Sequence, residues 1–261
     1  MHHPPLFVEW LLAFPFLLAF AVYITALMVS RKKGRSWPVT RILFWISGIL
    51  LCSISVVGPL AHVSHADFRM HMVGHLFLGM LGPLLMALGA PVKLLLRSMS
   101  VHQAKQLTNI LRSRLLGYMS NPAVTSTLNI GGLWVLYTTD LFHMMHENIL
   151  LHVVIHLHVF FAGYLFTVSM IYIDPIPHRT SYVYRSFILV LALAAHGILS
   201  KWIYAAPPAG VPREEAETGG MLMFYGGDAV DLIIIIILFY HWYRSTSPKK
   251  TIRNRRVPVP E

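Results

Sequence analysis

Seven stretches of apolar residues, each long enough to cross a bilayer as a helix, dominate this sequence. About 20 consecutive apolar residues suffice for a crossing, because an α-helix rises about 1.5 Å per residue. Only 12% of the 261 residues are charged, whereas a soluble domain usually carries about 25%. The chain is therefore predicted to be an all-α integral membrane protein. It is expected to form a seven-helix transmembrane bundle with spans at about 6–30, 41–61, 71–96, 122–142, 148–173, 184–206 and 220–244.

Lysine and arginine alternate between the predicted loops in a pattern that sets the orientation. The first, third and fifth loops and the C-terminal end are basic, whereas the other loops contain only Arg69 and Arg213. The positive-inside rule then places the N-terminus outside and the C-terminus in the cytoplasm. We expect one transmembrane domain over 1–244, an amphipathic helix on the inner leaflet within 98–120, and a basic, disordered tail over 245–261. This topology accounts for the net charge of +10, and nucleic-acid binding is rejected.

Two of the predicted spans carry a pair of histidines in their first turns. The pairs are His71 with His75 and His152 with His156. A spacing of four residues places both imidazoles of a pair on one helix face, one turn apart. Both helices are predicted to start on the outer side, so the four imidazoles should lie at similar depth. The sequence therefore predicts metal ligation by these four, either in one shared site or split between two sites.

Further histidines and methionines cluster at the same predicted membrane face. Imidazole and thioether ligands with no thiolate favour copper among the common metals, and Cys52 is the only cysteine. A metal relay toward the deeper site is predicted from His62, His65, His143, His146, Met72 and Met144. The terminal Met1-His2-His3 would suit Cu(II), although an idle terminus or a tag remnant explains it as well. The alternative for each such residue is structural, since membrane histidines hydrogen-bond between helices and methionines fill gaps.

Two carboxylates lie three residues apart within the last predicted span, where ionisable groups are functional candidates. Asp228 and Asp231 are expected either to pair with Lys201 or to orient a ligating histidine. A plain ion pair that fixes helix register explains them equally well. His196, in the middle of the sixth span, is predicted to be structural. His158 lies on a different face from the histidine pair and is predicted to bond a neighbouring helix or to support the site.

Glycine and proline punctuate the third predicted span. Glycines let membrane helices approach closely, as converging imidazoles require, and Gly163 follows His156 on the same helix face. Pro83 and Pro91 should bend the third span.

Three segments resemble a known family: HMVGHLFLGMLGPLLMALGAPV, HLHVFFAGYLFTVSMIYIDPIPHR and GGMLMFYGG. They are similar to the multi-span CtaG (caa3_CtaG) family of cytochrome c oxidase assembly factors, and the resemblance covers about 41–244. The family motif carries over to His71, His75, His156 and His152, and Asp228 matches an acidic position after the Gly-Gly segment.

The resemblance implies a bacterial, multi-pass protein of the cytoplasmic membrane that supplies copper to the catalytic subunit of a haem–copper oxidase. Together with the histidines it leads us to expect Cu(I) as the ion and the oxidase subunit and the lipid bilayer as partners. An extracytoplasmic copper donor and a second copy of the chain are further candidate partners. No nucleophile–base arrangement is evident, so we expect no enzymatic activity. Copper affinity should fall below about pH 6 as histidines protonate.

Four other functions compete with this interpretation. A haem-binding redox protein would use axial histidines from the third and fifth spans. A non-metal scaffolding factor for oxidase assembly would use the histidines structurally. A di-iron enzyme needs more carboxylates, and a copper transporter needs ligands continuing inward, so both are disfavoured.

Overall fold

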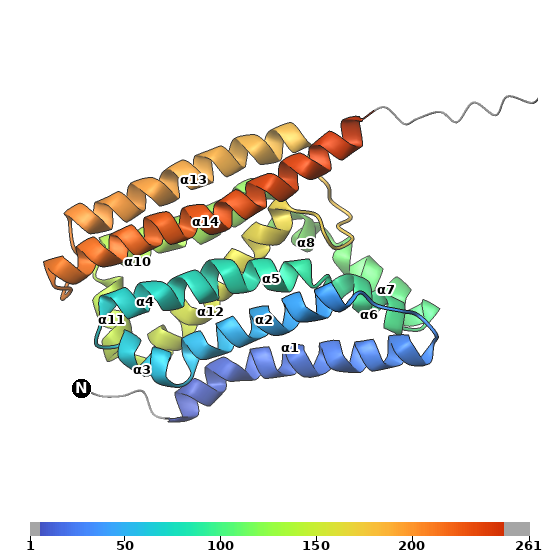
Figure 1. Cartoon of the computed structure of the whole chain (residues 1–261), viewed down its shortest axis with the longest axis horizontal. Coiled ribbons are helices and arrows are strands. Elements are labelled where there is room, and N and C mark those ends of the chain that lie inside the picture. The colour runs from blue at the N-terminus through green and yellow to red at the C-terminus, as the bar shows by residue number, and fades with distance from the viewer. Residues whose placement is uncertain (1–5, 248–261) are drawn as a thin grey trace, which may run out of the picture.

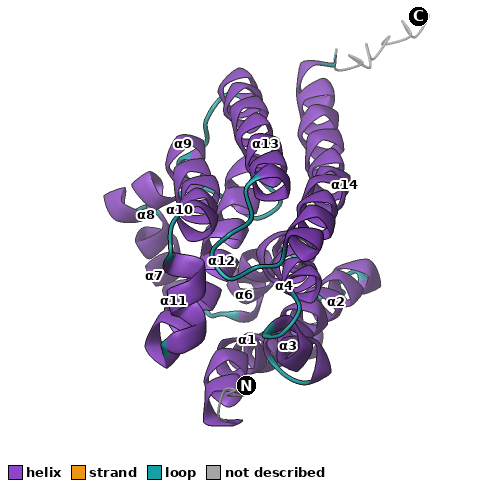
Figure 2. Ribbon diagram, turned by 90° about the vertical axis from the view of Figure 1, so that its left-hand side faces the viewer, coloured by secondary structure: helices purple, strands orange, loops and turns teal. Residues whose placement is uncertain are grey.

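The chain folds into a bundle of helices in the computed structural model, which describes residues 6–247 (Figures 1 and 2). No strand occurs among these residues, so the all-α prediction is confirmed. The predicted tail lies almost wholly outside the described residues, and so does Met1-His2-His3.

The helices, with π-helical segments marked η, are α1 Leu6–Lys32, α2 Val39–Val56, α3 Pro59–Ser64, α4 Phe68–His75, η1 Leu76–Leu81, α5 Gly82–Leu88, α6 Pro91–Ser98, α7 Val101–Leu111, α8 Arg114–Met119, α9 Pro122–Ser126, η2 Thr127–Gly131, α10 Gly132–Thr138, α11 Leu141–Glu147, α12 Ile149–Met170, α13 Tyr182–Ala205 and α14 Arg213–Thr246.

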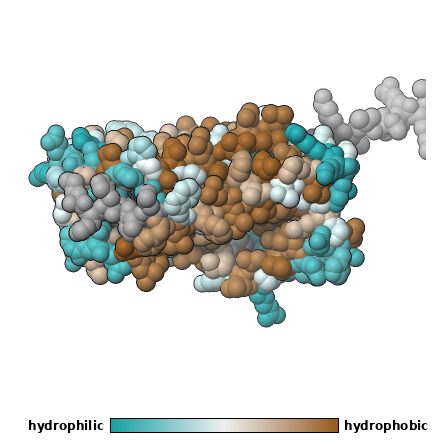
Figure 3. Space-filling view, turned by 90° about the horizontal axis from the view of Figure 1, so that it is seen from below, coloured by the Kyte–Doolittle hydropathy of each residue, from teal (hydrophilic) through white to brown (hydrophobic). Residues whose placement is uncertain are grey.

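Six helical stretches of the described chain are long and apolar enough to cross a membrane. They are Phe7–Lys32, Val39–Val56, Phe68–Ser98, Ile149–Met170, Tyr182–Ala205 and Arg213–Thr246. The predicted span at 122–142 is a shorter continuous helix of α9, η2 and α10, which ends where Thr139 becomes extended. Figure 3 shows the surface that these helices form on one face of the molecule, where an apolar band lies between two polar ends.

The two polar ends of the bundle carry different elements. The short helices α3 and α11 lie at the end where α1 begins, and α6, α7 and α8 lie at the opposite end, where α14 finishes (Figure 1). The predicted amphipathic segment 98–120 contains α7 and α8, and α7 starts with a capping box formed by Ser100 and Gln103. The first and last described residues therefore lie at opposite ends of the bundle.

The third predicted span is not one regular helix. Pro83 has no backbone N–H, so the α-helical bond to the Gly79 carbonyl cannot form, and the preceding turn takes the wider π-helical register of η1. The helix breaks again at Ala90, whose φ of 51° is left-handed, and α6 restarts at Pro91. The buried carboxylate of Asp174 holds this second break together by accepting from the N–H groups of Val92 and Lys93.

The second π-helical segment, η2, lies against α12. The imidazole of His158 donates its Nε2 proton to the Leu128 carbonyl inside η2 at 3.1 Å. A side chain on Gly132 would collide with that imidazole. The prediction that His158 bonds a neighbouring helix is therefore confirmed.

Candidate functional site

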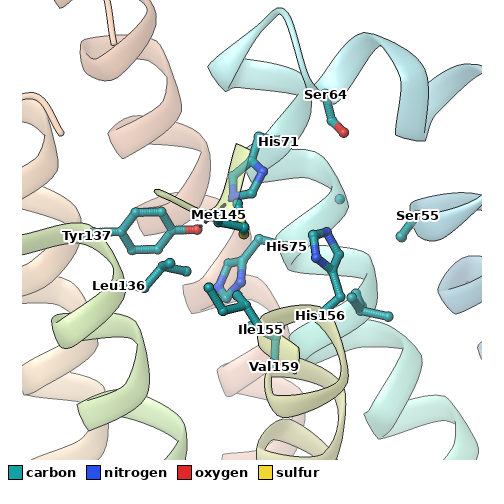
Figure 4. A pocket seen from close by; sticks show the side chains of 12 residues that line it. Ser55, Ser64, His71, His75, Leu136, Tyr137, Met145, Ile155, His156 and Val159 are labelled. Atoms are coloured by element: carbon teal, nitrogen blue, oxygen red, sulfur yellow. Dashed lines mark hydrogen bonds between the residues drawn. The ribbon is translucent and has the colours of Figure 1, made fainter. Parts of the chain in front are cut away.

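A cavity lies inside the bundle where the histidine-bearing helices α4 and α12 meet α10 and α11. Its wall includes His71, His75, Tyr137, Met145 and His156. In Figure 4 the three imidazoles and the Met145 side chain converge on one region, and the Tyr137 hydroxyl points toward them from the side. About 20 Å³ is free for the centre of a water-sized molecule, which is room for one or two small guests.

The start of α4 is fixed just outside the cavity. Asp67 is its N-cap and accepts from the backbone N–H of Arg69 at 2.8 Å, while Glu215 accepts from the backbone N–H of Phe68. The Asp67 carboxylate also pairs with the Arg69 guanidinium at 2.7 Å. This hydrogen bond is the main reason that the pKa of Asp67 is lowered. The cap and the Glu215 contact set the position of α4, and His71 follows one turn after Asp67.

The imidazoles of His71 and His75 differ in their hydrogen bonding. The Nε2 atom of His71 lies 3.1 Å from the Tyr137 hydroxyl. The Nε2 atom of His75 is buried and has no hydrogen-bond partner among the described residues. A buried imidazole nitrogen without a partner is costly, so His75 is available to a guest.

The tautomer of His156 follows from its backbone contact. Its Nδ1 lies 2.9 Å from the His152 carbonyl and must donate there, because a carbonyl only accepts. The neutral ring therefore keeps a lone pair on Nε2, which is the form that ligates metal ions. His146 is held in the same way by the Phe142 carbonyl at 2.8 Å.

A row of imidazoles connects the cavity to the end of the bundle that carries α3 and α11. Ring centroids are 4.0 Å apart for His152 and His156, 5.0 Å for His65 and His152, and 5.7 Å for His65 and His146. The rings of His71 and His146 are 6.3 Å apart. The structure thus brings two predicted relay residues, His65 and His146, into contact range of the predicted ligands. The imidazole of His152 belongs to this row and does not line the cavity.

An open vestibule leads to this row from the polar end of the bundle. It has about 180 Å³ free for the centre of a water-sized molecule and is lined by His65, His143, His146, Asp67 and Glu215, among other residues. Ser64 lines both the vestibule and the inner cavity. The two hollows therefore adjoin.

Other predicted site residues lie away from the cavity. Met72 is buried next to Gly219 of α14, and Met144 is exposed. His62 bonds Glu9 at 2.8 Å. The expected ion pair of Lys201 is not among those of the described residues; its ammonium lies 5.2 Å from the centroid of the Phe224 ring.

The two aspartates of α14 point in different directions. Asp228 is exposed on the outside of the bundle, whereas Asp231 is buried. Asp231 lines a separate small cavity with His75 and His196.

The cavity suits some metal ions better than others. Over residues 6–247, no group of three or more His, Cys, Asp or Glu side chains is arranged to hold a metal ion. The donors that line the cavity are imidazoles and the thioether of Met145. Such a set fits a soft ion of low coordination number, such as Cu(I), better than an ion that requires four histidines or several carboxylates.

Met145 and Tyr137 line the cavity but were not among the predicted site residues. Met145 is 1% exposed, and its neighbour Met144, which was predicted, is 51% exposed. Tyr137 comes from α10, where no histidine or carboxylate drew attention to it. The adjacent methionines were a usable signal, but the face of α11 that turns inward depends on the break at Thr139.

Comparison with known proteins places the chain in a family. The model of the cytochrome c oxidase caa3 assembly factor (Caa3_CtaG) matches residues 21–245. An uncharacterized protein of Mycobacterium leprae is 27% identical over 243 residues, which cover 85% of this chain and 37% of that protein. Uncharacterized proteins of Mycobacterium bovis and Mycobacterium tuberculosis are each 30% identical over 187 residues, covering 67% of this chain and 27% of theirs. The chain therefore spans about a third of the length of these relatives. No solved structure matches it. Because the family model covers most of the sequence, the chain belongs to the cytochrome c oxidase caa3 assembly factor family.

Proposed function

We propose that this assembly factor binds Cu(I) in the cavity between α4, α11 and α12 and passes it to the catalytic subunit of the oxidase. The observation that carries the proposal is the convergence of His71, His75, His156 and Met145 on one small cavity. The ion is cargo, so the site must hold it without trapping it. Uncharged imidazoles and a thioether meet that need, because they bind Cu(I) with no fixed negative charge.

The vestibule is the proposed entry route for copper. Glu215 brings a carboxylate to its wall, whereas Asp67 is paired with Arg69, and His65 and His146 provide exchangeable ligands between the vestibule and the cavity. An extracytoplasmic copper donor would deliver the ion at this end. A second copy of the chain as a partner has no specific contact to support it.

A seven-span topology with the N-terminus outside is part of the proposal. An odd number of crossings agrees with the opposite positions of the two described chain ends (Figure 1). The helix of α9, η2 and α10 would then be the fourth crossing, shortened by the break at Thr139. The basic loops favour a cytoplasmic position for α6 to α8. The vestibule would thus open outside the bacterial cytoplasmic membrane.

Haem binding between α4 and α12 is less well supported. The cavity admits one or two water-sized guests, whereas cofactor sites commonly enclose about 300–1,000 Å³. A metal-free scaffolding role remains the main alternative, and the experiment below separates it from copper binding.

The test is Cu(I) loading of the detergent-purified full chain under anaerobic conditions, with copper measured per chain. The variant His71→Ala/His156→Ala should bind one copper fewer than the wild type. The matched control is His102→Ala, which removes an exposed histidine of α7 and should leave copper unchanged. Equal copper in wild type and double variant would refute the site. Folded wild-type protein with no copper would favour the scaffolding role.

A further inference from the structure

A second, smaller cavity adjoins the first, and His75 lines both of them. It lies deeper in the bundle, between η1, η2, α12, α13 and α14, and its wall includes Met80, His196 and Asp231. About 10 Å³ is free for the centre of a water-sized molecule, so the space fits a single small guest.

Two imidazoles in this wall have unused binding capacity. The Nε2 atoms of His75 and His196 are both buried, and neither has a hydrogen-bond partner among the described residues. The side chains are nearly inaccessible, at 6% and 2% exposure. Gly227 makes room for the His196 ring, because a methyl group there would collide with it. One guest between the two imidazoles would satisfy both nitrogens.

The same wall carries a buried carboxyl group without a partner among the described residues. Asp231 is 4% exposed, and within residues 6–247 it makes neither a hydrogen bond nor an ion pair. A carboxylate in the interior of a membrane protein normally has a partner. Lys201 is not the partner of Asp231, since its ammonium lies over the ring of Phe224. A bound monovalent cation would stabilise the ionised form of this carboxyl group.

The donor set selects among monovalent cations. Two imidazoles and the thioether of Met80 are soft ligands, which favour Cu(I) over a hard ion such as Na⁺. We propose that the deeper cavity is a second Cu(I) site, ligated by His75, His196 and Met80 and neutralised by Asp231. The inference rests on the proposed copper function. It adds that the ion can move inward from the first cavity by ligand exchange at His75.

The experiment measures bound Cu(I) per chain at saturation, by competition with a chromophoric Cu(I) chelator, on the detergent-purified full chain. The wild type should bind two ions, the outer one held by His71, His156 and Met145 and the inner one by His75, His196 and Met80. His196→Leu and Met80→Leu should each bind one, and the outer variant His71→Ala/His156→Ala should also bind one. His196→Met should restore two, because its thioether ligates Cu(I) while its size matches that of leucine.

The outcomes separate this inference from the proposed function. Wild-type binding of one copper that survives His196→Leu and Met80→Leu would overturn the second site and leave the first intact. The second site would also be overturned if His196→Met and His196→Leu lost the same amount of copper, because ligation by residue 196 would then play no part. A wild type without copper would overturn both proposals.

Discussion

Gly163 of α12 packs directly on the backbone carbonyl of Gly79 in η1, so closely that no side chain fits between the two helices. The contact lies two turns beyond His156 on α12 and one turn beyond His75 on the other helix. It therefore sets the separation of the two helices that bring these imidazoles to one cavity. Close approach through small residues is the usual way in which membrane helices associate.

Substitution Gly163→Ala should destabilise the protein strongly. The added methyl would overlap a backbone carbonyl, which cannot move aside as a flexible side chain can. Overpacking of this kind costs about 1–3 kcal/mol. The measurement is the thermal unfolding midpoint in detergent. Gly131→Ala is the matched control, since its methyl would meet only Thr127 Cγ2 at 3.8 Å. Equal midpoints for the two variants would show that the contact does not limit the helix separation.

The hydrogen bond from His158 to η2 should be needed for stability. His158→Leu removes the donor to the Leu128 carbonyl and should cost about 1 kcal/mol of unfolding free energy. His158→Gln keeps an N–H donor and should recover part of the loss. Copper binding should change little in either variant, because His158 does not line the cavity. A large loss of copper in His158→Leu at unchanged stability would assign His158 to the site instead.

The N-cap of α4, Asp67, predicts that the unfolding free energy depends on pH. The hydrogen bond and ion pair from Arg69 lower the pKa of Asp67. A carboxyl whose folded-state pKa is lowered adds stability above its unfolded pKa, and this is lost as the pH falls through the folded value. The stability advantage of wild type over Asp67→Asn should therefore shrink as the pH is lowered below about 4.

Unfolding measured from pH 6 to pH 3 tests this sign. Asp67→Ala, which also removes the N-cap, should lose about 1 kcal/mol at neutral pH. The account would be contradicted if the difference in unfolding free energy between wild type and Asp67→Asn grew as the pH was lowered.

The sequence predicted the parts of the site that depend on local spacing. His71, His75 and His156 follow from helical periodicity, and all three line the cavity. The imidazole of His152 does not line the cavity. A spacing of four residues predicts which helix face two side chains share, but it does not predict the rotamer of each ring. The deeper cavity was not foreseen for a similar reason. It depends on how α13 and α14 are rotated, which decides that His196 and Asp231 point inward while Asp228 points outward.

Irregular helix geometry limits prediction at other positions. Pro83 indicated a bend, but the sequence did not indicate that the turn before it would become the π-helix η1. The break at Thr139 likewise ends the fourth predicted span early and turns Met145 inward. Both depend on packing between helices, which a single sequence does not reveal.

The most direct test of copper ligation in the first cavity is X-ray absorption spectroscopy of the Cu(I)-loaded protein. The Met145→Leu variant is compared with its sequence neighbour Met144→Leu, and all samples carry Met80→Leu so that only the first site contributes sulfur. Met145 lines the cavity and Met144 is exposed, so sulfur scattering should be present in the parent and in Met144→Leu and absent in Met145→Leu. Sulfur scattering that persists in Met145→Leu, or is missing from the parent, would contradict copper binding between His71, His156 and Met145.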